Sequence, residues 1–172
     1  MAEYLMGIDA GTGSVRVALF DFRGQNRAYA VAEYGTTYPK NGWAEQSDYE
    51  WFEALKKAIP ECIKKAGIAA DNIAAITCDA TTNTLVYLDE NDTSVRPPIL
   101  WMDVRATEEA SFIDTIREEY DATKFYKPGF RADTMVPKCM WVKKNEPENW
   151  AKTKTIMEFE DWLNWKLTGR KT

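Results

Sequence analysis

The fold of this chain is decided by the stretch Tyr4-Leu5-Met6-Gly7-Ile8-Asp9-Ala10-Gly11-Thr12-Gly13-Ser14-Val15-Arg16-Val17-Ala18-Leu19-Phe20-Asp21. It predicts an apolar strand, a glycine-rich turn and a second apolar strand, with the carboxylate of Asp9 where the first strand ends. Glycine accepts a positive φ and lets a backbone approach a bound group closely, and successive N–H groups can point at one anion. The turn therefore has the composition of a phosphate cradle, although a hairpin turn that binds nothing uses the same glycines.

The turn differs from two common phosphate-binding loops. It is not a G-x-G-x-x-G run, it lacks the G-K-[ST] ending, and the residues after Ser14 are strand-like rather than the start of a helix. A phosphate would therefore lie in a β-hairpin. Asp9 would then be free to hold a metal ion through water, because Mg²⁺ keeps most of its hydration shell and takes few carboxylates.

Composition narrows the class of protein. The 172 residues, 45% hydrophobic and 28% charged, suit one globular domain, and the net charge of −5 argues against a nucleic-acid surface. The absence of histidine excludes a histidine general base, Ser-His triads and most zinc sites. The odd number of cysteines and the lack of a signal peptide or membrane-length apolar run predict a cytoplasmic protein with buried thiols, at Cys62, Cys78 and Cys139.

The rest of the chain predicts an α/β protein. A third meander strand is expected over 27–34, and a helix over 48–66 begins at Ser47 or Asp48 and stops at Gly67. The short apolar run 73–78, which ends on Asp79, is typical of a buried parallel strand. Further predicted elements are strands at 84–88 and 98–101 around a turn at 89–92, a helix over 107–120, a mixed stretch over 121–134, a helix from Pro137, a helical turn at 148–152, a strand at 155–157 and a Trp-rich helix over 160–167.

Five segments in order carry a family resemblance that covers essentially the whole chain. They are Gly7 to Arg16; Gly42-Trp43-Ala44-Glu45-Gln46; Arg96-Pro97-Pro98-Ile99-Leu100-Trp101-Met102-Asp103-Val104-Arg105-Ala106; Val136-Pro137-Lys138-Cys139-Met140-Trp141 with Asn145-Glu146-Pro147-Glu148; and Glu160 to Gly169. Together they resemble the FGGY family of carbohydrate kinases, within the actin, hexokinase and Hsp70-like ATPase superfamily.

The resemblance implies a ribonuclease-H-like mixed sheet with flanking helices, and it makes residues 1–172 the N-terminal, sugar-binding lobe of a kinase. It implies transfer of the γ-phosphoryl group of ATP to a hydroxyl of a sugar or polyol, with ATP and Mg²⁺ as cofactors. The expected partner is that small molecule, with neither nucleic acid nor membrane, and a homodimer is a possible assembly. Phosphoryl transfer depends on positioning and charge neutralisation, which suits a phosphate turn, a metal-holding carboxylate and a cationic side chain.

Carried over by matching positions, the resemblance makes Asp9 the metal-positioning carboxylate. It assigns the γ-phosphate to Thr12, Gly13, Ser14 and Arg16, and the sugar to Asp79, Ala80, Thr81, Trp101, Asp103 and Arg105. Each assignment has an ordinary structural alternative: Arg16 could pair with a surface acid, and Trp101 could be a core residue. Asp103 and Arg105 could equally form a structural pair that orients Trp101. Three further residues are interpreted as structural markers of the fold: Glu45, Lys138 and Asp161.

The sequence departs from the family pattern at two points. The family's catalytic aspartate and its nucleotide lobe are expected beyond residue 172, so this chain is read as an N-terminal fragment that has no kinase turnover by itself. The Asp79-Ala80-Thr81-Thr82 run is closer to ribulokinases, whereas residues 137–142 look xylulokinase-like, and Ala80-Thr81 replaces the Arg-Glu pair of glycerol kinases. A ketopentose or pentitol is therefore the expected substrate. The alternatives are a non-catalytic sugar-binding or regulatory module and an actin- or Hsp70-like ATPase.

Overall fold

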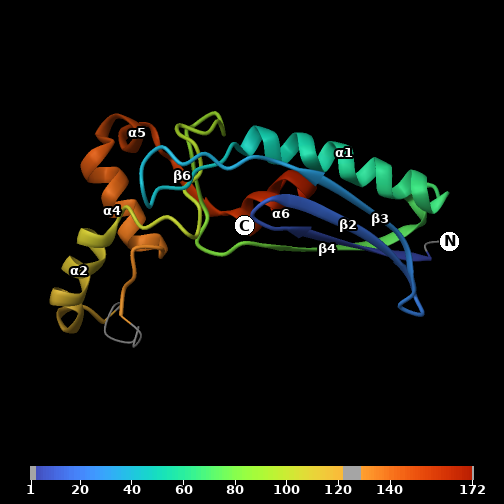
Figure 1. Ribbon diagram of the computed structural model, residues 1–172, viewed down its shortest axis with the longest axis horizontal. Coiled ribbons are helices and arrows are strands. Elements are labelled where there is room, and N and C mark those ends of the chain that lie inside the picture. The colour runs from blue at the N-terminus through green and yellow to red at the C-terminus, as the bar shows by residue number, and fades with distance from the viewer. Residues whose placement is uncertain (1–2, 122–128, 172) are drawn as a thin grey trace. The chain divides into compact units, whose positions relative to one another are not determined.

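A computed structural model of the protein describes residues 3–121 and 129–171 (Figure 1). The chain forms two compact units. Unit 1 comprises Met1–Thr36, Ser47–Thr81 and Phe159–Thr172, and unit 2 comprises Thr37–Gln46 and Thr82–Glu158. The length of the chain suggested one domain. The division was not visible in the sequence because unit 2 is assembled from two separate insertions into unit 1.

A four-stranded mixed sheet forms the centre of unit 1. Its strands are ordered β3-β2-β1-β4; β1 pairs antiparallel with β2, β2 pairs antiparallel with β3, and β4 runs parallel to β1. This confirms the predicted meander and the predicted parallel strand. The bounds are Tyr4–Ala10 for β1, Ser14–Asp21 for β2, Asn26–Glu33 for β3 and Ile73–Ala80 for β4.

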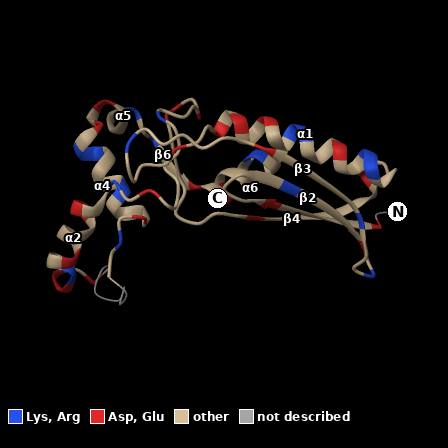
Figure 2. Cartoon of the chain, in the orientation of Figure 1, with Lys and Arg blue, Asp and Glu red and all other residues tan. Residues whose placement is uncertain are grey.

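Helix α1, Asp48–Ala66, covers one face of this sheet and matches its predicted range. The Ser47 hydroxyl accepts the backbone N–H of Glu50 at 3.4 Å, and Gly67 ends the helix with a left-handed φ of 67°. Alternating side chains of β2 and β3 pack beneath it, so that face of the sheet is buried. Charged residues line the side of α1 away from the strands (Figure 2).

Helix α6, Phe159–Thr168, completes the core of unit 1. Trp51 of α1 stacks on Phe159 with ring centroids 3.8 Å apart and meets Trp162 edge-on at 5.5 Å. Trp162 is buried, whereas Trp165 is only partly buried. The interpretation of the Trp-rich helix as core filler is thus confirmed for Trp162.

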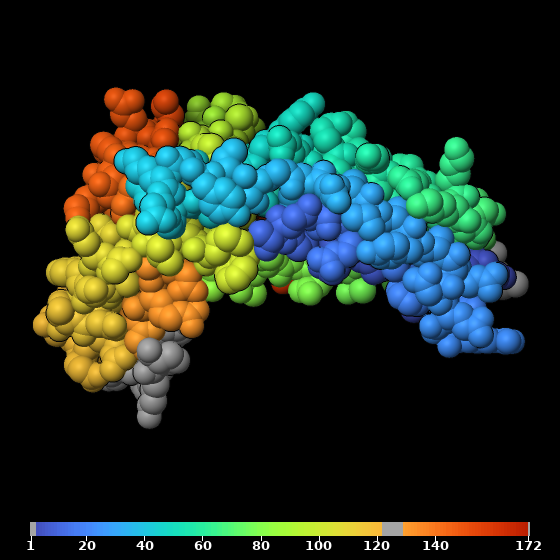
Figure 3. Space-filling view, in the orientation of Figure 1, coloured from blue at the N-terminus to red at the C-terminus, as the bar shows by residue number. Residues whose placement is uncertain are grey.

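Strand β4 differs from its prediction because most of it is exposed. Its residues 74–77 are exposed and Ile76 retains 50% of its accessible surface. The reason lies in the layers: within the described part of unit 1, α1 and α6 pack on the sheet from the side that buries Met6 and Ile8, and β4 is an edge strand. Figure 3 shows α1, in green, along one side of the blue strands β2 and β3.

Unit 2 is built on a short antiparallel pair. Strand β5, Leu85–Leu88, pairs with β6, Thr155–Glu158, and isolated bridges join Leu85 to Ile99 and Leu88 to Ser94. The predicted strand over 98–101 is reduced to Ile99, which forms isolated bridges with Leu85 and Glu45, while β6 forms the ladder with β5. The helices of unit 2 are α2, Thr107–Ile116; α4, Met135–Asn145; and α5, Pro147–Lys152. The 3₁₀ turn η2, Arg117–Glu119, follows α2. A further 3₁₀ turn, η1, lies in unit 1 at Ala70–Asn72.

The helix predictions in unit 2 are confirmed, with shifted ends. The expected helix over 107–120 is α2 plus η2, and α4 begins two residues before Pro137. Part of the predicted mixed stretch, 122–128, lies outside the described residues. No helix in the described parts of the chain is long and apolar enough to cross a membrane. All three cysteines are free; Cys62 is buried as predicted, whereas the other two are partly buried.

Candidate functional site

The glycines around the turn after β1 do not have a left-handed backbone, and among them Gly11 has a close neighbour. Gly7, Gly11 and Gly13 are not among the glycines with positive φ. The Gly11 N–H donates to the Ser14 carbonyl at 3.0 Å, and a Cβ on Gly11 would lie 2.5 Å from Nη2 of Arg16. The missing side chain at Gly11 therefore makes room for the guanidinium beside the turn.

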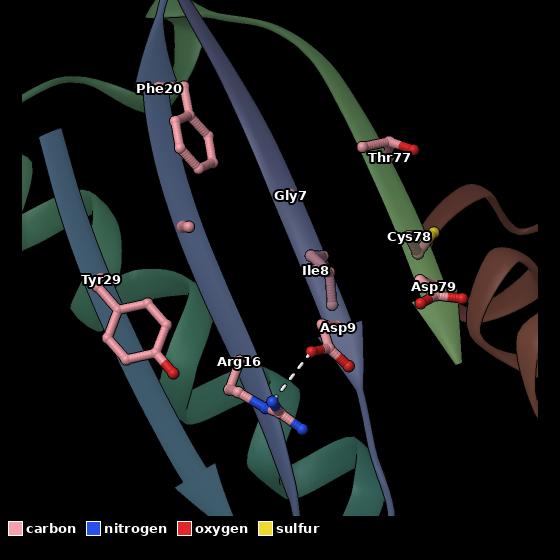
Figure 4. Close-up of a pocket in the computed structure, with 10 residues that line it drawn as sticks. Gly7, Ile8, Asp9, Arg16, Phe20, Tyr29, Thr77, Cys78 and Asp79 are labelled. Atoms are coloured by element: carbon pink, nitrogen blue, oxygen red, sulfur yellow. Dashed lines mark ion pairs between the residues drawn. The ribbon is translucent and has the colours of Figure 1, made fainter. Parts of the chain in front are cut away.

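Asp9 and Arg16 face each other across the hairpin. They are register partners in the β1–β2 ladder, and Nη1 of Arg16 lies 3.2 Å from Oδ2 of Asp9 (Figure 4). Both side chains are about half exposed, at 45% for Arg16 and 49% for Asp9. An ion pair this exposed contributes about 0.2–1 kcal/mol, so a phosphate or a cation could replace either partner at small cost. The structural alternative for Arg16 was an ion pair with a surface acid, and the acid it contacts is Asp9 of the same motif.

Asp79 lies next to this pair at the end of the neighbouring strand. It is the register partner of Asp9 in the parallel β1–β4 ladder, and its side chain is exposed. Asp9, Arg16 and Asp79 line one cleft of about 480 Å³ on the sheet face opposite α1, where Figure 4 shows them on three adjacent strands. The wall of the cleft is largely apolar, with Phe20 and Tyr29 among its residues.

Tyr34, directly after β3, holds the turn between β1 and β2 through two hydrogen bonds. Its hydroxyl donates to the Gly11 carbonyl at 2.5 Å, and its backbone N–H donates to the Gly13 carbonyl at 3.2 Å. Burial, together with the nearby Asp9 carboxylate, raises the pKa of Tyr34 far above its ordinary value, so the hydroxyl stays a donor. Sequence reasoning missed this residue, because a tyrosine after a strand carries no motif and its contact depends on the three-strand register.

Replacing Tyr34 with phenylalanine is expected to lower the free energy of unfolding by about 1–2 kcal/mol. The change leaves the ring in place and removes the partner of the Gly11 carbonyl, which is part-buried. Urea denaturation followed by tryptophan fluorescence measures the effect. Tyr38→Phe is the matched control because Tyr38 is 65% exposed; equal losses in the two variants would contradict the role given to the Tyr34 hydroxyl.

In unit 2, Arg105 is buried between two indoles. Its Cζ lies 4.0 Å from the ring centroid of Trp43 and 5.0 Å from that of Trp141, which themselves meet edge-on. Nε and Nη2 form a bidentate pair with Asp103, at 2.9 and 2.7 Å, and Nη2 also lies 2.8 Å from Oε1 of Glu45. The side chain of Arg105 has no exposed surface.

The carboxylate of Asp103 is fully used by this network. Besides the two bonds from the Arg105 guanidinium it accepts the backbone N–H groups of Ala44, at 2.6 Å, and of Arg105, at 2.9 Å. Those donors fill the acceptor positions of a carboxylate. Asp103 and Arg105 therefore have the geometry of the structural pair that the sequence left open as an alternative to sugar contact.

Glu45 joins this pair to a second arginine. Arg96 donates to Oε1 of Glu45 at 2.6 Å and to Oε2 of Glu146 at 2.8 Å, and its side chain is 3% exposed. Glu45 thus bridges Arg96 and Arg105, which agrees with its interpretation as a marker of the fold. A buried cluster of this kind holds the loop 37–46 against residues 96–105 through many hydrogen bonds.

The remaining predicted site residues are accessible. Trp101 is 43% exposed, and its backbone N–H donates to Oγ1 of Thr84 at 3.1 Å. It is therefore not a core residue. Ala80 ends β4 and is partly buried, as are Thr81 and, in the turn, Thr12 and Ser14, whereas Gly13 is exposed. Asp79, Ala80 and Thr81 belong to unit 1 and Trp101 to unit 2.

Comparison with protein families matches residues 4–172 to the N-terminal domain of the FGGY family of carbohydrate kinases. The chain belongs to this family. It is 34% identical over 166 residues to a xylulose kinase of Lactococcus lactis, a match that covers 96% of this chain and 33% of that protein. It is 30% identical over 182 residues to a glycerol kinase of Mycoplasma pneumoniae, covering 98% and 34%.

The fold of this FGGY chain agrees with solved structures. A structure described as a xyloylose kinase from Brucella ovis superposes with a TM-score of 0.87 at 27% identity, over 97% of this chain and 34% of that one. The predicted mixed sheet with flanking helices, of the actin and hexokinase type, is thereby confirmed. The chain spans about a third of the length of the FGGY proteins it matches.

Proposed function

We propose that this chain is the sugar-binding, phosphate-facing lobe of a carbohydrate kinase, which in its full-length form transfers the γ-phosphoryl group of ATP to a hydroxyl of a sugar or polyol. The observation that carries the proposal is the FGGY match over residues 4–172, which includes the hairpin that presents Asp9 and Arg16. A separable ion pair at the mouth of an open cleft suits phosphoryl transfer, in which charge neutralisation and positioning dominate.

The donor set at the hairpin fits Mg²⁺. Asp9 offers an exposed carboxylate and Asp79 a second one in the adjacent register position, while Mg²⁺ takes one or two carboxylates and completes its shell with water and phosphate oxygens. Bound Mg²⁺ would neutralise phosphate charge. Asp9 would hold the ion, and Thr12, Gly13, Ser14 and Arg16 would face the γ-phosphate, with Arg16 exchanging its contact to Asp9 for one to phosphate.

For the sugar we propose contacts from Asp79, Ala80, Thr81 and Trp101. The exposed indole of Trp101 offers apolar area to a sugar C–H face and one N–H donor. Asp103 and Arg105 would act through the loop that carries Trp101, because the Asp103 carboxylate already accepts four hydrogen bonds and the Arg105 side chain has no exposed surface. A ketopentose or pentitol is the proposed substrate class, supported by the similarity to xylulose kinases and by Ala80-Thr81.

A panel of sugars and polyols, assayed with ATP and Mg²⁺ on the full-length protein by coupled ADP release, tests this proposal. We expect turnover with a ketopentose or pentitol at a kcat/KM about 100-fold above that with glycerol. The 172-residue chain alone is expected to show no sugar-dependent ADP release. Absence of turnover with every sugar and polyol, or sugar-dependent turnover by the isolated chain, would contradict the proposal.

A further inference from the structure

Lys138 is a fully buried lysine on α4, with none of its surface exposed. Its ammonium donates to two backbone carbonyls, those of Asn83 at 2.6 Å and Leu100 at 2.8 Å. Burying a cation is costly unless its donors are satisfied, so this placement needs a strong local reason.

Burial also changes the acidity of this group, lowering the pKa of Lys138 to about 8. The carboxylates of Asp103, Asp133 and Glu158 oppose that effect, and the Arg105 guanidinium adds to it. At neutral pH the group is therefore still an ammonium, whose hydrogen bonds to carbonyls are charge-assisted.

The two carbonyls belong to segments that run side by side. Leu85 and Ile99 exchange backbone hydrogen bonds of 2.9 and 3.0 Å, and one step further along Oγ1 of Thr84 accepts the N–H of Trp101. Lys138 then joins the same two segments at Asn83 and Leu100. The ammonium thus closes the end of a short ladder, directly before the exposed indole of Trp101.

Asn83 is held at both of its backbone polar groups. It has a φ of 55°, in the left-handed region that asparagine adopts more readily than most non-glycine residues. Its N–H donates to Oε2 of Glu158 at 3.2 Å, and its carbonyl accepts from Lys138. Removal of the ammonium would leave the Asn83 carbonyl without this donor, while the Asn83 N–H keeps its bond to Glu158. It would also release the Leu100 carbonyl from one of its two donors, the other being the Asp103 N–H at 3.0 Å.

We propose that Lys138 is a positioning residue for the sugar site: it holds the Asn83 and Leu100 carbonyls and thereby fixes the place of Trp101. The inference rests on the proposed sugar-kinase function, in which Trp101 contacts the sugar. It goes beyond that function by giving a buried residue on α4, which does not itself contact the sugar, control over sugar affinity.

The test uses the full-length protein with Lys138→Met, which keeps the length and apolar stem of the side chain and removes its donors. We expect the KM for the sugar to rise about 10-fold and the KM for ATP to stay within about two-fold of the wild-type value. Lys143→Met is the matched control, because Lys143 lies on the same helix and is exposed. In a Trp101→Ala background Lys138→Met should cause no further rise in sugar KM, because the two residues act in one chain of contacts.

Two further measurements decide the proposal if Lys138→Met does not fold or if the wild type turns over no sugar. Thr84→Val removes the acceptor of the Trp101 N–H with little change in shape, and should raise the sugar KM about three-fold. Acrylamide quenching of Trp101, taken as the difference between each protein and its Trp101→Phe counterpart, reports the indole's position without any substrate. A difference in Trp101 quenching between Lys138→Met and the wild type supports the positioning role of Lys138. If Lys138→Met is unfolded, the same comparison is made with Thr84→Val. This readout needs no substrate, so it holds even if the kinase proposal itself fails. Unchanged quenching, an unchanged sugar KM, or equal shifts for sugar and ATP would overturn it.

Discussion

Replacing Arg105 with methionine is expected to lower the free energy of unfolding by about 3–5 kcal/mol. The Arg105 guanidinium is the partner of a completely buried Asp103 and of Glu45, and methionine would leave both carboxylates without that cation. The stacking of the guanidinium on Trp43 and Trp141 would also be lost. Urea denaturation monitored by tryptophan fluorescence measures the loss, with circular dichroism to confirm that the variant is folded before denaturant is added.

The chain supplies a closely matched control in Arg131→Met. Arg131 forms the same two-residue-spaced bidentate pair with Asp133, at 2.9 and 2.6 Å, but its side chain is 67% exposed. That substitution should cost about 0.2–1 kcal/mol, since solvent screens the pair. Arg105→Lys should fall between the two, because it keeps the charge and loses the fork geometry. Similar losses for Arg105→Met and Arg131→Met would show that burial of the network does not matter.

The helix and strands of unit 1 were predicted well because caps, glycines and hydrophobic spacing within each short segment determine them. The range of α1 follows from Ser47, the apolar spacing of the helix and Gly67, all within one stretch of sequence. Asp9 and Arg16 could be assigned to one site because a hairpin joins them. The exposure of β4 could not be predicted: Ala74, Ala75 and Ile76 are apolar in composition, and only the placement of the helices decides which face they cover.

In unit 2, local sequence patterns did not determine the roles of the buried charged residues. For Asp103 and Arg105 the family resemblance implied sugar contact, while their spacing also allowed a structural pair, and nothing within that segment separates the two. The deciding contacts come from Ala44 and Glu45, about sixty residues earlier, and from Trp141 on α4. The role of Lys138 was equally hidden in the sequence, because its two carbonyl partners lie 55 and 38 positions away. Such contacts depend on tertiary register, which a single sequence does not encode as a motif.

The substitution Asp9→Asn in the full-length protein is expected to lower kcat by on the order of 10²–10³-fold while leaving the fold intact. Asparagine keeps the size of the side chain but removes the charge proposed to hold Mg²⁺. The sugar KM should change less than kcat, because Asp9 is not itself among the proposed sugar contacts, although Asp79 lies beside it. Coupled ADP release across a range of Mg²⁺ concentrations measures the effect, and the concentration of Mg²⁺ that gives half-maximal rate should rise. Glu33→Gln is the control, since Glu33 is an exposed acid on β3 of the same sheet.

The free energy of unfolding of Asp9→Asn distinguishes a role of Asp9 in the reaction from a role in stabilising the fold. The Asp9–Arg16 pair is half exposed, so its loss should lower the free energy of unfolding by only about 0.2–1 kcal/mol, too little to reduce the amount of folded protein. A large fall in kcat with an unchanged unfolding midpoint therefore assigns Asp9 to the reaction. A variant that keeps wild-type kcat and Mg²⁺ dependence would instead show that the hairpin carboxylate only neutralises Arg16, and the metal would then have to be held by other residues of the full-length protein.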